Sequence, residues 1–73
     1  MPRKREIKLK ILELLRGIYP QDLSIGEVAK QLGIARSTAS SWLKVLAAEG
    51  KIEISRKVGN AIFYRFKKGG GDV

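Results

Sequence analysis

The chain of 73 residues contains no cysteine and no histidine. Without cysteine there is no disulfide bond, and without either residue type there is no metal site with thiolate or imidazole ligands. A glycine-rich phosphate loop and a pair of neighbouring carboxylates that could transfer protons are also missing. We therefore expect a protein that is not an enzyme and that holds no metal and no cofactor.

Long apolar runs are missing too. No segment approaches the roughly 20 apolar residues of a membrane-spanning helix, and no signal-peptide pattern is present. We expect a soluble protein of the cytoplasm without a membrane partner. A chain of this length forms one domain with a modest core, because it buries only about 60% of the surface that its unfolded form exposes.

Acidic residues are few, since seven Asp and Glu stand against fifteen Lys and Arg, which gives a net charge of +8. The excess lies at the two ends. Residues 1–10 carry five basic and one acidic side chain (+4), and residues 51–73 carry six basic and two acidic (+4). Residues 11–35 hold two basic and three acidic side chains (−1), and residues 36–50 hold two basic and one acidic (+1). This distribution favours a polyanionic partner such as nucleic acid, because neutralised phosphates release their counterions.

Apolar periodicity predicts a first helix over residues 3–16. Its core stripe, at helical spacing, consists of Ile7, Ile11, Leu14, Leu15 and Ile18. Leu9 and Leu12 lie off this stripe. They are either tolerated surface leucines or the contact of a homodimer.

The second predicted helix begins with a capping box, in which Ser24 and Glu27 each bond the other's backbone amide through their side chains. A very short strand is expected near Leu23. Gly33 then permits a left-handed turn, which lets a third helix over residues 36–49 cross the second. Two helices joined by a tight glycine-containing turn predict the unit that places its second helix in the major groove of DNA.

The third predicted helix has a buried stripe of Ala39, Leu43 and Leu46. Its opposite side carries Ser37, Ser41 and Lys44, with Ser40 beside them. Serine and threonine are indifferent helix formers, so this face costs stability. A contact with DNA would explain that cost, whereas fraying of the helix end is the alternative. Trp42 lies roughly 60° from the centre of the stripe, either as a partly buried residue at the core edge or as a contact to phosphate or a partner.

After Gly50 the apolar period changes to about 2, which predicts a β-hairpin. A three-residue loop over 58–60 would pair Lys57 with Ala61 and set Glu53 opposite Arg65, an attractive pair. A two-residue loop over 59–60 is rejected, because it would set Ile54 against Arg65. In the chosen register one face of the hairpin carries Ile52, Ile54, Ile62, Tyr64 and Phe66, and the other carries Glu53, Ser55, Lys57, Phe63 and Arg65.

Two segments resemble known proteins. Residues 23–52, LSIGEVAKQLGIARSTASSWLKVLAAEGKI, resemble the core of small prokaryotic winged helix-turn-helix regulators of the arsenic-repressor-like and multiple-antibiotic-resistance-repressor-like kinds. Residues 56–66, RKVGNAIFYRF, resemble the arsenic-repressor-like wing, with a basic pair, a glycine at the tip and an aromatic pair on the return strand. The resemblance covers residues 5–67 and implies an α+β fold in which three helices precede a β-hairpin wing.

The resemblance further implies that the helix over 36–49 enters the major groove of double-stranded DNA and that the wing over 56–61 lies on the backbone or in the minor groove. The candidate contacts on the helix are Arg36, Ser37, Thr38, Ser40, Ser41 and Lys44. Those on the wing are Arg56, Lys57 and Asn60. Arginine suits bidentate contacts to guanine, so Arg36 is expected to read a base and Lys57 to bind phosphate.

The expected organisation is a basic N-terminal arm over residues 1–5, a winged helix-turn-helix domain over 6–67 and a disordered glycine-rich tail over 68–73. The expected function is that of a DNA-binding transcriptional regulator in a prokaryotic cytoplasm, associated with the nucleoid. We expect a homodimer, since one recognition helix reads only a few base pairs. No small-molecule ligand is inferred. The alternatives are a winged-helix module that contacts protein in a replication, transcription or chromatin assembly, and non-specific architectural binding.

Overall fold

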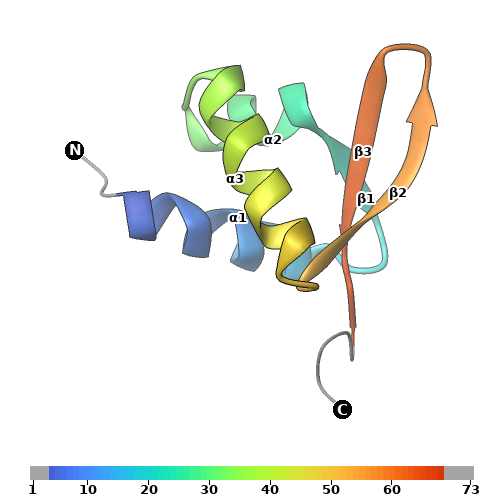
Figure 1. Ribbon diagram of the computed structural model, residues 1–73, viewed down its shortest axis with the longest axis horizontal. Coiled ribbons are helices and arrows are strands. Elements are labelled where there is room, and N and C mark those ends of the chain that lie inside the picture. Colours follow the sequence, from blue (N-terminus) through green and yellow to red (C-terminus); the bar gives the residue numbers. More distant parts are fainter. Residues whose placement is uncertain (1–3, 69–73) are drawn as a thin grey trace.

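The computed structural model describes residues 4–68 and combines three helices with a small antiparallel sheet (Figure 1). In chain order the elements are α1 (Lys4–Gly17), β1 (Asp22–Ser24), α2 (Ile25–Leu32), α3 (Arg36–Ala48), β2 (Ile52–Val58) and β3 (Ala61–Phe66). The sheet has the order β1-β3-β2, so β3 is its central strand. The predicted winged helix-turn-helix fold is confirmed, including the very short strand at Leu23. Residues 1–3 of the expected arm and 69–73 of the expected tail lie outside the described residues.

The core lies where the helices meet the sheet. Its buried side chains come from all three helices and from both long strands: Ile11, Leu15, Val28, Ala29, Ala39, Leu43, Leu46, Ile52 and Tyr64. Full burial of one large apolar side chain stabilises the fold by about 1.5–3 kcal/mol relative to exposure. Packing, rather than intrinsic helix propensity, therefore holds these short helices in place.

The orientation of α1 differs from the prediction at two leucines. Leu12, expected off the core stripe, packs against the core, whereas Leu14 is half-buried and does not belong to that cluster. Lys8 lies one turn before Leu12, and its Nζ contacts the Glu49 carboxylate after α3 at 2.7 Å. This side of α1 therefore faces α3. Leu9 remains 52% exposed.

The junction between α2 and α3 follows the predicted chemistry. The Ser24 hydroxyl accepts a hydrogen bond from the Glu27 amide, and the Ser24 amide donates to the Glu27 carboxylate at 3.0 Å, so the capping box is confirmed. Gly33 ends α2 in the left-handed region with φ 66°, where a side chain would be strained. The N-cap of α3 is Ala35, whose side chain makes no capping hydrogen bond.

The loop of the hairpin differs from the prediction. Val58 pairs with Ala61, so the loop has two residues, Gly59 and Asn60, and the predicted three-residue loop is wrong. The register nevertheless returns to the predicted one further down, with Glu53 opposite Arg65, because a bulge lies between Ile54 and Arg56. The extra residue of a bulge offsets the pairing by one position.

The bulge also changes which side chains share a face of the sheet. Residues paired directly across antiparallel strands point to the same side. Arg56 pairs with Phe63 and Lys57 with Ile62, so Lys57 lies on the side of Ile62, not with Phe63 as predicted. Ile62 packs against the core, which makes this the helix-facing side. Ile54 also belongs to this side by register, yet it is 58% exposed on the outer strand β2.

Candidate nucleic-acid interface

The outward side of α3 is polar and open, as predicted. Arg36, Ser37, Ser41 and Lys44 are exposed, whereas Thr38 and Ser40 are half-buried. Ser37, Ser41 and Lys44 follow one another at intervals of four and three residues, which aligns them along one side of a helix. Neither Arg36 nor Lys44 forms an ion pair with any residue between 4 and 68. Their charges therefore remain available to a partner.

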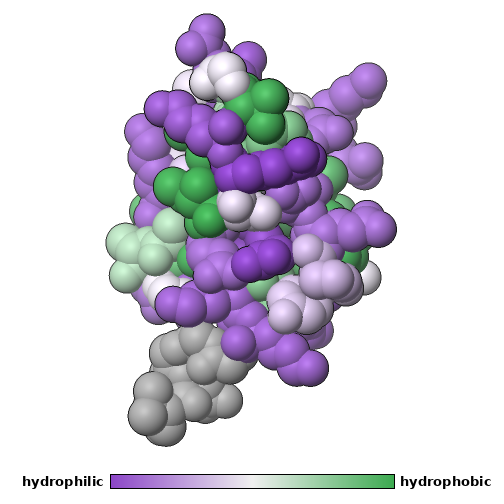
Figure 2. Space-filling view, turned by 90° about the vertical axis from the view of Figure 1, so that its right-hand side faces the viewer, coloured by the Kyte–Doolittle hydropathy of each residue, from purple (hydrophilic) through white to green (hydrophobic). Residues whose placement is uncertain are grey.

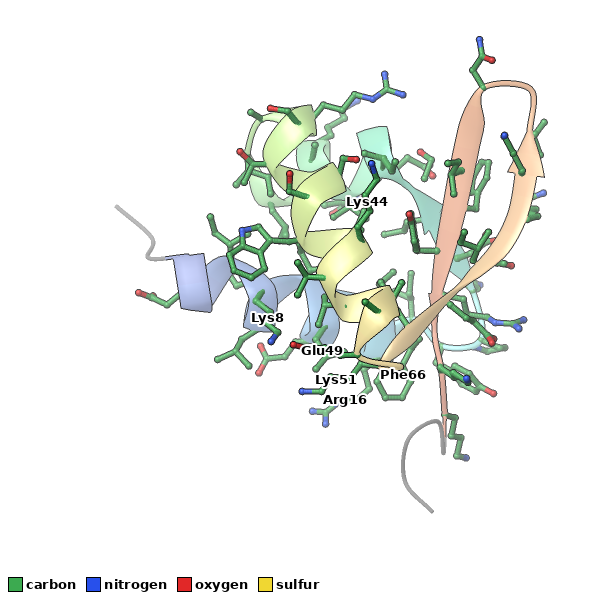
Figure 3. The ribbon with its side chains drawn as sticks, in the orientation of Figure 1. Lys8, Arg16, Lys44, Glu49, Lys51 and Phe66 are labelled. Carbon is green, nitrogen blue, oxygen red and sulfur yellow. The ribbon has the colours of Figure 1, made fainter. Side chains whose placement is uncertain are left out.

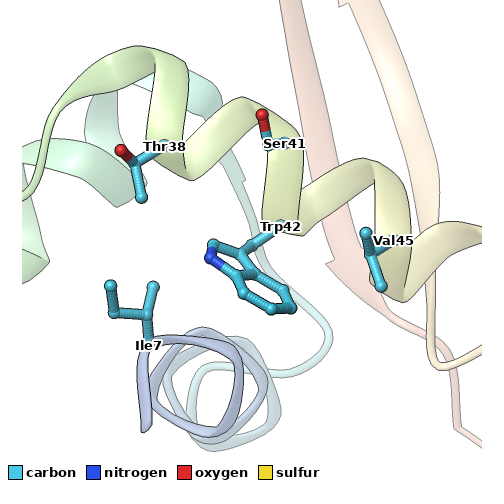
Figure 4. Close-up of a pocket in the computed structure, with 5 residues that line it drawn as sticks. All are labelled: Ile7, Thr38, Ser41, Trp42 and Val45. Carbon is cyan, nitrogen blue, oxygen red and sulfur yellow. The ribbon is translucent and has the colours of Figure 1, made fainter. Parts of the chain in front are cut away.

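Trp42 lies between this surface and α1. Its indole lines a pocket of about 320 Å³ together with Ile7, Thr38, Ser41 and Val45 (Figure 4). Trp42 is half-buried and packs against the core, which fits the interpretation of a residue at the core edge. Thr38 and Ser41 of the polar side of α3 line the same pocket, so Trp42 lies next to that surface.

The basic residues of the wing point in different directions. Arg56 lies on the outer side of the sheet, where its Nε donates to the Asp22 carboxylate at 3.1 Å and its guanidinium lies 4.3 Å from the centre of the Phe63 ring. Lys57, on the helix-facing side, makes no ion pair within the described chain. Asn60 is exposed in the tight loop at the hairpin tip.

Asp22 of β1 forms an ion pair with Arg56. β1 ends at Ser24, the N-cap residue of α2. A hydrogen bond with the Ser55 side chain and the positive charge of Arg56 lower the pKa of the Asp22 carboxyl below its ordinary value, against the opposing effect of burial. Ser55 is the residue at the bulge. The contacts of Arg56 with Asp22 and Phe63, and the hydrogen bond between Ser55 and Asp22, do not follow from the predicted register, because that register has no bulge.

The face that includes the sheet is predominantly hydrophilic, with apolar residues in separate patches (Figure 2). Ile54 and Val58 of β2 are among the exposed large apolar residues of the protein.

Within residues 4–68 no group of three or more acidic side chains could hold a metal ion. The helices between residues 4 and 68 do not have the length and apolar character of a membrane-spanning segment.

The hairpin tip and the N-terminal half of α3 lie at the same end of the molecule (Figure 1). The part of α3 that contains Arg36, Ser37 and Ser41 therefore lies toward the same end as the hairpin tip. Lys44 follows Ser41 by about one turn, in the second half of the helix. Such an arrangement brings unpaired cations and hydroxyl groups together on elements that can reach a groove and the adjacent backbone of a duplex.

Comparisons with known proteins agree with this geometry. The model of the IclR helix-turn-helix domain matches residues 6–56. No curated protein matches the chain. Among solved structures, reduced HlyU from Vibrio cholerae N16961 is similar, with a TM-score of 0.65 and 25% sequence identity over 89% of this chain and 74% of that chain. The chain thus belongs to the IclR helix-turn-helix domain family, which confirms the winged helix-turn-helix resemblance and supports a DNA-binding transcriptional regulator.

Proposed function

We propose that this regulator binds double-stranded DNA with α3 in the major groove and with the wing on the backbone or in the minor groove. The observation that carries the proposal is the open polar strip of α3, in which Arg36, Ser37, Ser41 and Lys44 are exposed and neither cation is paired within residues 4–68. A solvent-facing helix side with several hydroxyls and no acidic residue matches the chemistry of base edges and phosphates.

Each residue of the strip has a proposed role. Arg36, at the start of α3, reads a base edge, because the first residues of a recognition helix reach deepest into the groove. Ser37 and Ser41 bond bases or phosphates, and Thr38 and Ser40 contribute from the sides of the strip. Lys44 contacts the phosphate backbone.

On the wing, Lys57 supplies the main phosphate contact. It lies on the helix-facing side of the sheet and is exposed, whereas the neighbouring Arg56 is already bound to Asp22. Asn60 approaches the backbone or the minor groove from the hairpin tip. Arg56 contributes long-range attraction while it holds the wing in position.

We further propose that the protein acts as a homodimer in a prokaryotic cytoplasm, associated with the nucleoid. Two copies would read half-sites about 10 bp apart, which supplies the specificity that one short helix lacks. Leu9 of α1 is the candidate contact because it is exposed, whereas Leu12 packs against the core. Sedimentation of the native protein and of Leu9→Gln at high concentration tests this step. A native monomer both with and without its DNA site would contradict it.

The deciding experiment is selection of bound duplexes from a random pool. We expect enrichment of a short motif, repeated in two half-sites, and its loss in a Ser37→Ala/Ser41→Ala variant. A Gln21→Ala variant is the matched control, because it also loses an exposed polar side chain but lies in the turn after α1, outside the strip and the wing. Binding without enrichment would indicate the architectural alternative, which the net charge of +8 would favour. No binding to duplex DNA would favour a module that contacts protein.

A further inference from the structure

A second cationic surface lies at the base of the hairpin. Arg16, Tyr19, Phe66 and Lys68 line a pocket of about 310 Å³, which we call the Tyr19–Phe66 pocket. Arg16 and Phe66 lie at the lower end of the molecule, and Lys51 lies beside them (Figure 3). The proposed DNA contacts are absent from its lining.

The pocket is remote from the hairpin tip. Phe66 pairs with Ile52 at one end of the hairpin, and Ala61 pairs with Val58 at the other. Phe66 lies five positions after Ala61 on β3, which corresponds to about 17 Å at the usual rise of a β-strand. A molecule small enough for this pocket cannot also contact the tip of the wing.

Backbone hydrogen bonds fix the walls of the pocket. The Tyr19 amide donates to the Arg16 carbonyl at 3.3 Å, and the Gln21 amide to the Ile18 carbonyl at 2.8 Å, so the turn after α1 is held by two bonds. The Lys67 amide donates to the Lys51 carbonyl at 3.1 Å, which anchors the chain after β3. The rings of Tyr19 and Phe66 meet edge to face, 6.1 Å apart at an interplanar angle of 87°.

The lining combines two aromatic rings with two cations. No acidic residue lines the pocket, and neither Arg16 nor Lys68 has an ion-pair partner among residues 4–68. The nearby Glu49 carboxylate is occupied by Lys8 and Lys51. Tyr19 is 43% exposed, so part of its ring is open to a ligand.

We propose that the Tyr19–Phe66 pocket binds a small aromatic anion. The ring of the ligand packs on the exposed aromatic surface, and its carboxylate or phosphate binds Arg16 and Lys68. The pocket volume lies at the lower end of the about 300–1,000 Å³ that is usual for small-molecule sites, which suits a single ring with one anionic group. Arginine and lysine at the rim provide charge-assisted hydrogen bonds to such a group. The inference does not depend on the proposed DNA binding.

Matched ligands test the two parts of this chemistry. Benzoate, benzamide and cyclohexanecarboxylate are titrated into the isotope-labelled full chain without DNA, and amide and aromatic chemical shifts are followed. Benzamide lacks the charge and cyclohexanecarboxylate lacks the aromatic ring. We expect benzoate to bind most tightly, with shifts centred on Tyr19 and Phe66. Phenyl phosphate, titrated in parallel, distinguishes a phosphate from a carboxylate ligand.

Variants test the location. Lys68→Gln should weaken the binding of benzoate about fivefold, the effect of losing one exposed ion pair. Lys10→Gln removes the same charge from another exposed lysine and should leave the binding unchanged. Tyr19→Leu should remove the preference for benzoate over cyclohexanecarboxylate, and Arg16→Gln provides a second measurement if that variant does not fold.

The proposal is overturned if no ligand produces shifts at Tyr19 and Phe66. It is also overturned if Lys10→Gln weakens binding as much as Lys68→Gln, or if the shifts spread equally over Lys44 and the wing. Either of the last two results would indicate general attraction of anions to a basic protein.

Discussion

The guanidinium of Arg56 on β2 is joined to the carboxylate of Asp22 on β1, with 3.1 Å between Nε and Oδ2, although the two residues are 34 positions apart in the sequence. The two strands flank β3, so this pair spans the central strand on the outer side of the sheet. It connects the wing to the strand directly before the capping box of α2. The position of the wing is therefore tied to the start of the helix-turn-helix.

This pair leads to a comparison of two adjacent cations. Lys57→Gln should weaken duplex binding and reduce the slope of log K against log salt by about 0.9, the value for one lost phosphate contact. Arg56→Gln should change that slope less and should lower the free energy of unfolding by less than about 1 kcal/mol, because its ion pair and ring contact are solvent-exposed. Salt-dependent binding assays and urea denaturation measure the two effects. Equal salt slopes would contradict the division of roles.

Arg36 is expected to specify a base. Arg36→Ala should cost about 1–3 kcal/mol on the selected site and relax the preference at one position. Lys44→Ala serves as the control for a phosphate contact and should weaken the binding of all duplexes by the same factor. The measurement is competition between the selected duplex and its single-base variants. A uniform loss for Arg36→Ala would reassign this residue to the phosphate backbone.

The start of α3 lacks a side-chain cap, because its N-cap residue is Ala35. The backbone there is already extended, with φ −66° and ψ 145°, as a capping serine requires. Ala35→Ser should therefore raise the free energy of unfolding by about 0.5–2 kcal/mol. Urea denaturation measures the change, and Ala48→Ser at the other end of α3 is the control, which should give no gain.

Acid should weaken two ion pairs. Hydrogen bonding and the charges of Arg56 or Lys8 and Lys51 lower the pKa of Asp22 and Glu49 from their ordinary values of 3.8 and 4.5. A carboxyl with a lowered pKa in the folded state stabilises the fold above its unfolded pKa, and the effect is lost as the pH falls through the folded value. Melting temperatures are measured from pH 6 to pH 2. We expect them to decrease once the pH is lower than about 4.5.

Asp22→Asn and Glu49→Gln should each flatten this acid decline. Glu13→Gln, an exposed glutamate without an ion pair among residues 4–68, should keep it. If the melting temperature depends on pH in the same way in the native protein and in both charge variants, these ion pairs do not contribute to the stability of the fold.

Local signals predicted most of the helical part. The capping box at Ser24 and the glycine at position 33 are short-range features, so their geometry follows from neighbouring residues. The exposed side of α3 likewise follows from helical periodicity. The rotation of α1 does not, because Leu12 and Leu14 are both compatible with a helical stripe, and the contact of Lys8 with Glu49 joins residues 41 positions apart.

The hairpin shows why a register argument can fail in one part and hold in another. Gly59 and Asn60 are suited to a two-residue loop, and this signal was available in the sequence. An unbroken ladder from such a loop would place Ile54 opposite Arg65, which argues against the two-residue loop from sequence alone. The bulge near Ser55 satisfies both the tight loop and the pairing of Glu53 with Arg65. Its effect on Arg56 and Lys57 required the three-dimensional structure.

The bulge has a consequence for solubility. β2 is an outer strand of the sheet, so one row of its backbone amides and carbonyls faces away from β3. A straight apolar edge of this kind can recruit a strand from another molecule and start aggregation. Here the edge is irregular beside Ser55 and is followed by two positively charged residues, Arg56 and Lys57. The irregularity that turns Arg56 to the outer side of the sheet and Lys57 to the helix-facing side therefore also discourages edge-to-edge association between copies of the protein.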